Sequence, residues 1–149
     1  MVEDTQVKGK KAKFTEIENE KIVAKMVEYA NERNLDAMMK YFSEDVSAQW
    51  PYAMEKWAKK DIRAIFERSF KIWSNGVYRI IRLVSSGGTV VAQVHWAGVQ
   101  TGDWPRYGIP ATGRRVELVE VWIMELVGGR VRVYEVFYNP DLVVQQLRN

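Results

Sequence analysis

Alternating runs of apolar and polar residues, separated by glycine turns, fill the second half of the chain. β-Branched and aromatic residues are frequent in these runs, which is typical of β-strands. Ser86-Gly87-Gly88 and Gly128-Gly129 mark tight turns between consecutive strands. The predicted strands are Val77–Ser85, Thr89–Thr101, Arg114–Leu126 and Arg130–Tyr138. Long strands joined by short turns indicate an antiparallel meander.

Helical spacing dominates the first half of the chain. Thr15-Glu-Ile-Glu18 is a capping box, and it begins a predicted helix with one apolar stripe. The remaining predicted elements are a short helix carrying Leu35, Met38, Met39 and Phe42, a brief strand Val46–Trp50, a helix Asp61–Trp73 ended by Asn75-Gly76, and a final helical turn or two over Asp141–Leu147. Helices followed by a meander predict the α+β class.

The order of elements predicts one domain over residues 14–149, preceded by a flexible basic tail over residues 1–13. We expect a curved antiparallel sheet wrapped around about three N-terminal helices, so that the domain forms a cone with an internal pocket. The chain has 149 residues, which suits a single domain.

Composition excludes several classes of function. With no Cys and a single His, a disulfide framework or a thiolate or histidine-rich metal site is not expected. Much of the net charge of +3 lies in the N-terminal tail without a recognition motif, so we expect no nucleic-acid partner. No membrane-length apolar run and no signal peptide is present in the sequence, which predicts a cytoplasmic protein without a membrane partner.

Several segments carry a resemblance to a known family. Gly108, Pro110, Thr112, Gly113 and Arg114 match a loop motif of the SnoaL-like polyketide cyclase group, within the nuclear-transport-factor-2-like superfamily. The chain end resembles the same group's ending, with matches at Gly129, Arg130, Tyr138, Asn139, Pro140, Gln146 and Leu147. The stretch from Ala30 to Ala53 is similar to the group's first helical hairpin and strand, so the resemblance covers about residues 15–147. It implies the cone fold, but not one reaction, because this superfamily hosts many activities.

The catalytic groups of related enzymes are not kept in this chain. By resemblance to limonene epoxide hydrolase, the positions of its Arg and Asp carry Gln93 and His95, and a later Asp position carries Val136. The position of the ketosteroid isomerase base carries Trp50. We therefore assign none of those reactions by analogy.

The cavity walls follow from strand alternation and the resemblance together. Alternation sorts each strand into two faces but does not say which face is inside. The resemblance favours an inner set that would bind substrate or carry out catalysis. This set comprises Trp50, Gln93, His95, Leu118, Glu120, Trp122, Tyr134, Val136 and Tyr138.

Glu120 and His95 are the predicted catalytic residues. Glu120 stands among apolar neighbours, where loss of hydration raises a carboxyl pKa into a range useful for acid–base chemistry. The expected register brings His95 opposite Glu120, so that the two can share a proton. The alternative interpretation is a buried pair that only satisfies its own polar groups.

Two functions are consistent with these patterns. The first is a cofactor-independent isomerase or cyclase of lyase type, acting by acid–base chemistry on a hydrophobic or aromatic carbonyl compound. The second is a non-catalytic ligand-binding or dimeric accessory domain of the same fold. In either case we expect the outer sheet face to pair two copies into a homodimer. This face is assigned Glu117, Val119, Glu125, Glu135 and Trp96.

Overall fold

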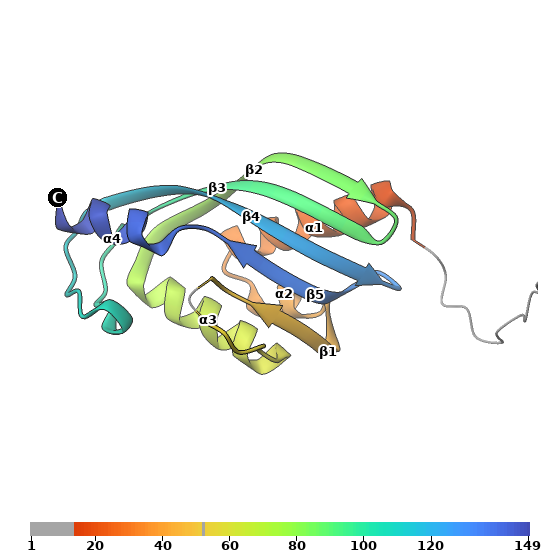
Figure 1. Ribbon diagram of the computed structural model, residues 1–149, viewed down its shortest axis with the longest axis horizontal. Coiled ribbons are helices and arrows are strands. Elements are labelled where there is room, and N and C mark those ends of the chain that lie inside the picture. Colours follow the sequence, from red (N-terminus) through yellow and green to blue (C-terminus); the bar gives the residue numbers. More distant parts are fainter. Residues whose placement is uncertain (1–13, 52) are drawn as a thin grey trace, which may run out of the picture.

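A five-stranded sheet forms the frame of the molecule, and helices pack along its concave side and one end (Figure 1). The computed structural model describes residues 14–51 and 53–149, so the predicted basic tail lies outside the described residues. The elements are α1 (Glu16–Asn31), α2 (Leu35–Met39), β1 (Phe42–Gln49), α3 (Lys59–Ile72), β2 (Trp73–Ser86), β3 (Thr89–Gln100), the 3₁₀ helix η1 (Pro105–Tyr107), β4 (Arg115–Val127), β5 (Arg130–Phe137) and α4 (Pro140–Arg148).

The sheet is mixed rather than wholly antiparallel. Its strand order is β1-β5-β4-β3-β2, and the four strands from β2 to β5 form the predicted antiparallel meander. Strand β1 pairs in parallel with β5, where Ala48 lies opposite Tyr134. Parallel neighbours require a long connection between them, and here α3 and the strands β2, β3 and β4 separate β1 from β5 along the chain.

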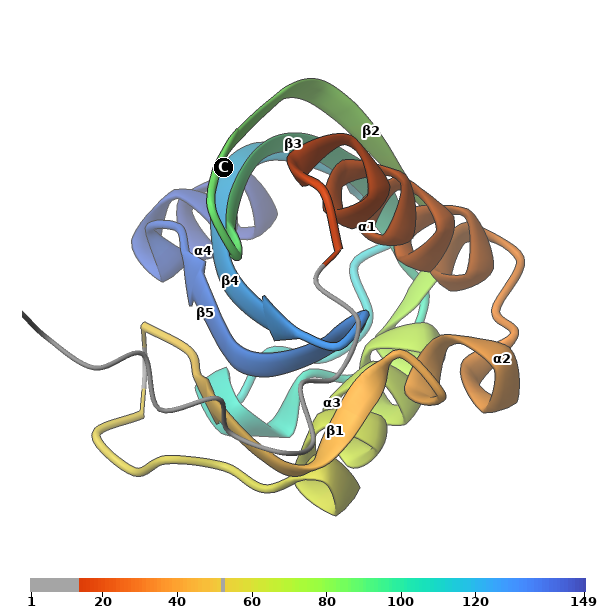
Figure 2. The same cartoon turned by 90° about the vertical axis from the view of Figure 1, so that its right-hand side faces the viewer.

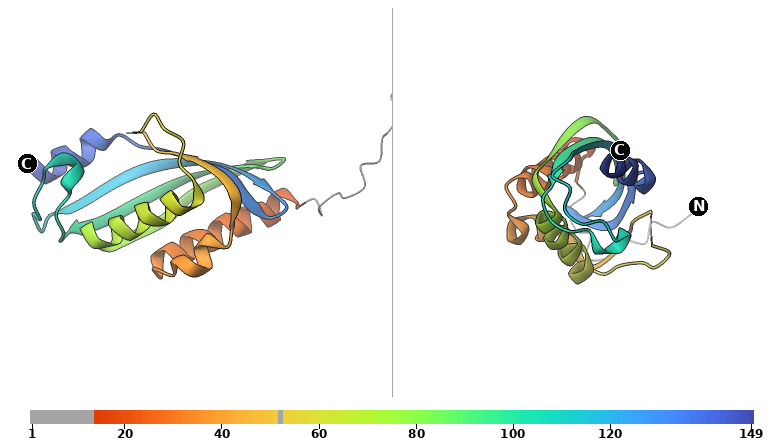
Figure 3. Two further views of the ribbon diagram at one scale, coloured as in Figure 1. Left: turned by 90° about the horizontal axis from the view of Figure 1, so that it is seen from below. Right: turned by 90° about the vertical axis from the view of Figure 1, so that its left-hand side faces the viewer.

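The sheet curls strongly around a central axis, and α1 and α3 lie along its open side (Figure 2; Figure 3). Bulges contribute to this curvature, because an extra residue on one strand bends and twists it. In β2 the pairing shifts between Ser74 and Val77 and again between Ile80 and Arg82, and Asn75 at the first shift has a positive φ of 53°. The predicted break at Asn75-Gly76 is therefore a bulge within a strand that already begins at Trp73.

Local signals in the sequence fix the ends of the helices. The Thr15 hydroxyl accepts a hydrogen bond from the Glu18 amide at 3.1 Å, and the Glu18 carboxylate accepts one from the Thr15 amide at 2.8 Å, so the predicted capping box is confirmed. The C-terminal helix α4 begins at Pro140 and is capped by the side chain of Asn139. None of the helices in the described part of the chain is long and apolar enough to cross a bilayer.

Two apolar clusters fill the interior. The larger one joins α1, α2 and α3 to the sheet around Met26, Phe42 and Trp122. The smaller one joins α4 and the β3–β4 loop to the sheet around Trp73, Trp96 and Val143. A cavity lies at the junction of the two clusters, because residues of both belong to its wall.

Candidate functional site

A cavity of about 440 Å³ is enclosed by β4, β5, β2, α3 and the loop that contains η1. This volume lies within the range of small-molecule sites. The lining residues are Trp50, Ile65, Phe66, Arg68, Ser69, Ile72, Tyr78, Trp96, Trp104, Pro105, Arg106, Leu118, Glu120, Trp122, Tyr134, Val136, Tyr138 and Val143.

Strand β4 directs Glu120 into this cavity. Burial along β4 alternates, and Leu118, Glu120 and Trp122 lie on its inner side. The partner of Glu120 on β3 is Val94, which is fully buried. Cross-strand partners share a face, so the predicted inward orientation of β4 is correct.

The predicted orientation of β3 was wrong, because its other face lies inside. Its buried residues include Val90, Ala92, Val94 and Trp96, whereas Gln93 and His95 lie on the outer side, where they pair with Val121 and Val119. Neither Gln93 nor His95 lines the cavity, and His95 does not meet Glu120, whose partner on β3 is Val94. The physical reason is burial, because the face of β3 that is apolar from Val90 to Gly98 covers the core, while the face with Gln93 and His95 lies on the outer side.

Trp96 accordingly lines the cavity instead of the outer sheet face. Glycines give its ring the space to lie there. A Cβ atom built on Gly98 would stand 2.8 Å from the Trp96 ring, and one on Gly76 would stand 3.2 Å from it. The ring packs edge-on against Trp73, with 5.1 Å between centroids.

Glu120 is a buried acid that lacks an ion-pair partner among the described residues. The residue is 7% exposed, and burial raises the pKa of its carboxyl to about 7. The indole N–H of Trp122 opposes this rise in pKa. Trp122 Nε1 has no hydrogen-bond partner, so its contact with Glu120 does not reach hydrogen-bond geometry. A carboxyl of this kind exchanges protons readily near neutral pH.

Tyr134 supplies a second polar group to the same cavity. Its ring packs edge-on against Trp50 and Trp122, with centroids 5.3 and 5.7 Å away. Burial and the neighbouring Glu120 charge raise the pKa of the Tyr134 hydroxyl well above its ordinary value. The hydroxyl therefore keeps its proton at neutral pH and can donate a hydrogen bond to a ligand oxygen.

The remaining predicted wall residues all line the cavity. Trp50 lies at the end of β1, Leu118 and Trp122 lie on β4, and Val136 and Tyr138 lie on or just after β5. The wall is therefore rich in aromatic rings, and its polar atoms include the Glu120 carboxyl and the Tyr134 hydroxyl.

Comparison with known proteins assigns the family. The family described as SnoaL-like polyketide cyclase matches residues 20–147. The chain belongs to this family.

Solved structures show the same fold. AclR from Streptomyces galilaeus, a candidate hydroxylase, has a TM-score of 0.81 at 18% identity over 90% of this chain and 83% of its own. A candidate SnoaL-like polyketide cyclase from Jannaschia sp. CCS1 has a TM-score of 0.80 at 16% identity over 89% and 92% of the two chains. TsrD from Streptomyces laurentii has a TM-score of 0.78 at 19% identity over 90% and 97%. None of the curated proteins compared with the chain matches it in sequence.

The motif that carries the SnoaL-like resemblance shapes the loop at the cavity mouth. Gly108 and Gly113 have positive φ angles of 62° and 67°, which glycine adopts without strain. The buried Gln100 side chain accepts hydrogen bonds from the Thr112 amide at 3.1 Å and hydroxyl at 2.7 Å. These bonds hold the ends of the loop together, and Trp104, Pro105 and Arg106 of this loop line the cavity.

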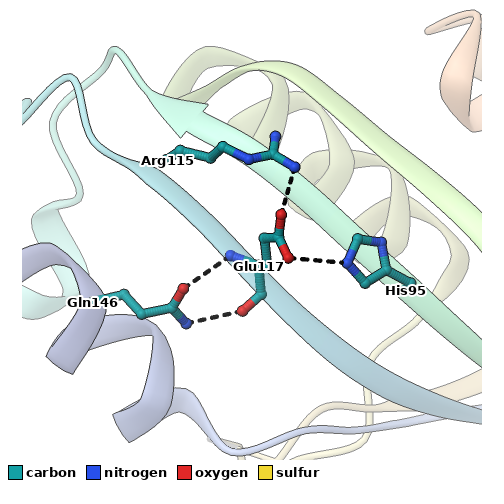
Figure 4. A network of polar contacts seen from close by, with 4 residues as sticks. All are labelled: His95, Arg115, Glu117 and Gln146. Carbon is teal, nitrogen blue, oxygen red and sulfur yellow. Dashed lines mark hydrogen bonds and ion pairs between the residues drawn. The ribbon is translucent and has the colours of Figure 1, made fainter.

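His95 belongs to a different network in this SnoaL-like protein (Figure 4). Its Nε2 lies 3.4 Å from a carboxylate oxygen of Glu117, whose other oxygen accepts a hydrogen bond from Arg115. Arg115 first, and His95 second, lower the pKa of Glu117. The Gln146 side chain of α4 bonds the Glu117 amide and carbonyl at 3.0 and 2.8 Å. Gln146 thus satisfies the backbone hydrogen-bonding groups of Glu117, which lies beyond the end of the pairing between β4 and β5.

Sequence reasoning missed the contribution of α3. Ile65, Arg68, Ser69 and Ile72 line the cavity at spacings of three and four residues. Residues at those spacings share one helix face, so this stripe could have been found from the sequence. No group of three or more His, Asp or Glu side chains suited to hold a metal occurs within residues 14–51 and 53–149.

Proposed function

We propose that this SnoaL-like protein transfers protons at a carbon next to a carbonyl group in a hydrophobic small molecule, without a cofactor. The observation that carries the proposal is Glu120, a carboxyl without an ion-pair partner in the described residues, on the wall of an aromatic cavity. Catalytic acids and bases are commonly tuned toward neutral pH by burial of this kind.

The carboxylate of Glu120 would act as the general base. It takes the proton from the carbon, and the electron pair of the broken C–H bond forms an enolate whose charge lies on the carbonyl oxygen. The Tyr134 hydroxyl would donate a hydrogen bond to that oxygen as its charge develops. Return of the proton at another carbon isomerises the ligand. Attack of the enolate carbon on a second carbonyl closes a ring, with the Glu120 proton passing to the new alkoxide.

The cavity wall favours a flat ligand. Its aromatic side chains, including Trp50, Trp122 and Tyr138, offer large rigid surfaces to a ring system. The volume of about 440 Å³ suits a ligand of two or three fused rings. Leu118 and Val136 complete the apolar contact.

Proton exchange tests the proposal without knowledge of the natural substrate. The probe is 2-acetylnaphthalene, a flat ketone whose methyl protons can be replaced by deuterium in D2O and followed by NMR. We expect the wild-type protein to accelerate this exchange and Glu120→Gln to lose about 10²–10⁴-fold of the acceleration. The matched control Glu125→Gln alters an exposed glutamate of the same strand and should keep the full rate.

Calorimetric binding of the probe separates the two candidate functions. Binding without accelerated exchange in the wild-type protein would overturn the catalytic proposal and favour the non-catalytic ligand-binding domain. Equal exchange by wild type and Glu120→Gln would remove Glu120 from the mechanism. Retained affinity in Glu120→Gln, together with lost exchange, is the result that supports a base.

We further propose a homodimer that pairs through the outer sheet face. Large apolar side chains on this face are about half exposed, among them Val84, Val119 and Phe137 at 57%, 48% and 47%. Such residues are candidates for burial between two copies. Light scattering should give twice the monomer mass for the wild type and the monomer mass for Val119→Asp. The control Met54→Asp changes an exposed loop residue and should remain dimeric; a monomeric wild type would contradict the proposal.

A further inference from the structure

Two arginines belong to the cavity wall although neither takes part in the proposed proton transfer. Arg68 comes from the cavity-facing stripe of α3, and Arg106 comes from η1 in the β3–β4 loop. Both residues are exposed, so they lie where the cavity meets solvent, whereas Glu120 is buried. The cavity therefore has a cationic mouth and a single acid in its interior.

Arg68 brings an unpaired positive charge to the mouth of the cavity. Arg68 forms no ion pair or hydrogen bond with the described residues. The Glu67 carboxylate, next to Arg68 in the sequence, accepts a hydrogen bond from Arg63 at 3.0 Å. Among the lining residues Glu120 is the only acid.

We propose that the ligand of this cavity carries a carboxylate at the end opposite its reacting carbonyl, and that Arg68 and Arg106 bind this carboxylate at the mouth. This inference rests on the proposed function, since it assumes that the cavity is the ligand site. A planar guanidinium donates paired hydrogen bonds to a carboxylate, which gives both strength and orientation. A cleft with low-dielectric walls also concentrates the potential of its charges on an incoming anion.

The arrangement of charges along the cavity determines the orientation of the ligand. A carboxylate pointing inward would lose its hydration among Trp96, Leu118 and Trp122 and would meet the Glu120 carboxyl. A carboxylate pointing outward keeps part of its hydration and meets two guanidinium groups. The carbonyl end then points toward Glu120, as the proposed proton transfer requires.

A matched pair of ligands tests the inference. The probes are 6-acetyl-2-naphthoate and 6-acetyl-2-naphthamide, which share the ketone and ring system and differ in the charge at the far end. We expect the wild-type protein to bind the carboxylate at least tenfold more tightly than the amide in calorimetry at low salt. Arg68→Gln and Arg106→Gln should each reduce carboxylate affinity about three- to tenfold and leave amide affinity unchanged, and the double variant should show no preference.

The control is Arg82→Gln, which removes the same charge from an exposed position on β2 outside the cavity. It should leave both affinities unchanged. Equal wild-type affinities for the two probes would overturn the carboxylate proposal while leaving the proposed function intact. An Arg82→Gln effect as large as that of Arg68→Gln would also overturn it, because the preference would then reflect net charge. Failure of both probes to bind would overturn the proposed function together with this inference.

Discussion

Replacing Glu120 with glutamine should stabilise the fold at alkaline pH and leave its stability almost unchanged at acidic pH. Burial raises the pKa of this carboxyl from an ordinary value of 4.5 to about 7. Between these two values the folded protein holds a proton that the unfolded chain has lost. Stability must therefore fall as the pH rises through this window, and the full penalty is present above pH 7.

The size of the penalty follows from the same two values. Each pH unit between them corresponds to about 1.4 kcal/mol, so the interval from 4.5 to about 7 amounts to about 3 kcal/mol. Solvent screens little of this penalty, because Glu120 is only 7% exposed. Glutamine has nearly the same shape and does not ionise, so the variant avoids the penalty.

Urea unfolding at pH 4 and pH 8.5 measures the effect. The free energy of unfolding of Glu120→Gln should match that of the wild type at pH 4 and exceed it by about 3 kcal/mol at pH 8.5. Glu125→Gln, an exposed change on the same strand, should stay within about 0.5 kcal/mol of wild type at both values. If Glu120→Gln is equal to or less stable than wild type at pH 8.5, the carboxylate is not desolvated and the reasoning fails.

Three further changes test the frame of the site. Gln146→Ala should lower the free energy of unfolding by about 1–2 kcal/mol in urea titrations, because two hydrogen bonds to the β4 backbone are lost; the exposed neighbour Gln145→Ala should have little effect, and equal losses would contradict the role of the amide. Gln100→Ala should cost about 2 kcal/mol and speed hydrogen exchange in the β3–β4 loop, because its side chain accepts two hydrogen bonds there; unchanged exchange would show that the loop is held by other contacts. Trp122→Phe removes the N–H that favours the charged form of Glu120, so a carbon-13 NMR titration should show the carboxyl pKa rising further; a lower pKa would contradict this electrostatic role.

Local patterns predicted most of the fold. The capping box at Thr15 and the glycine turns at Gly87 and Gly128 mark the ends of helices and strands close to the positions that the sequence indicated. These signals work because they satisfy backbone groups and φ angles within a few residues. The parallel pairing of β1 had no such signal, since it depends on contacts with β5 about ninety residues further along the chain.

The inner face of β4 was predicted correctly, whereas the inner face of β3 was not. On β4 the acid Glu120 was correctly assigned to the inner face. On β3 the resemblance to related enzymes favoured Gln93 and His95 as cavity residues, although the alternate face is apolar from Val90 to Gly98. The burial rule for antiparallel sheets would have chosen correctly there. Analogy failed because a family keeps its fold while the residues on a strand change.

The arginines at the mouth show a further limit of sequence reasoning. Arg68 and Arg106 lie on different elements, and only the folded chain brings both to one cavity. The stripe on α3 was visible in the sequence, but the position of η1 depends on how Gln100 holds the β3–β4 loop. Separately, each arginine resembles an ordinary surface residue.

The dependence of ketone proton exchange on pH tests the central role of Glu120 most directly. The rate of deuterium incorporation into 2-acetylnaphthalene should rise with pH, reach half of its plateau near pH 7, and lose this step in Glu120→Gln. This result follows because the carboxylate, and not the protonated acid, removes the proton. A half-maximum near pH 4.5, or the same profile in both proteins, would contradict the assignment of Glu120 as the base.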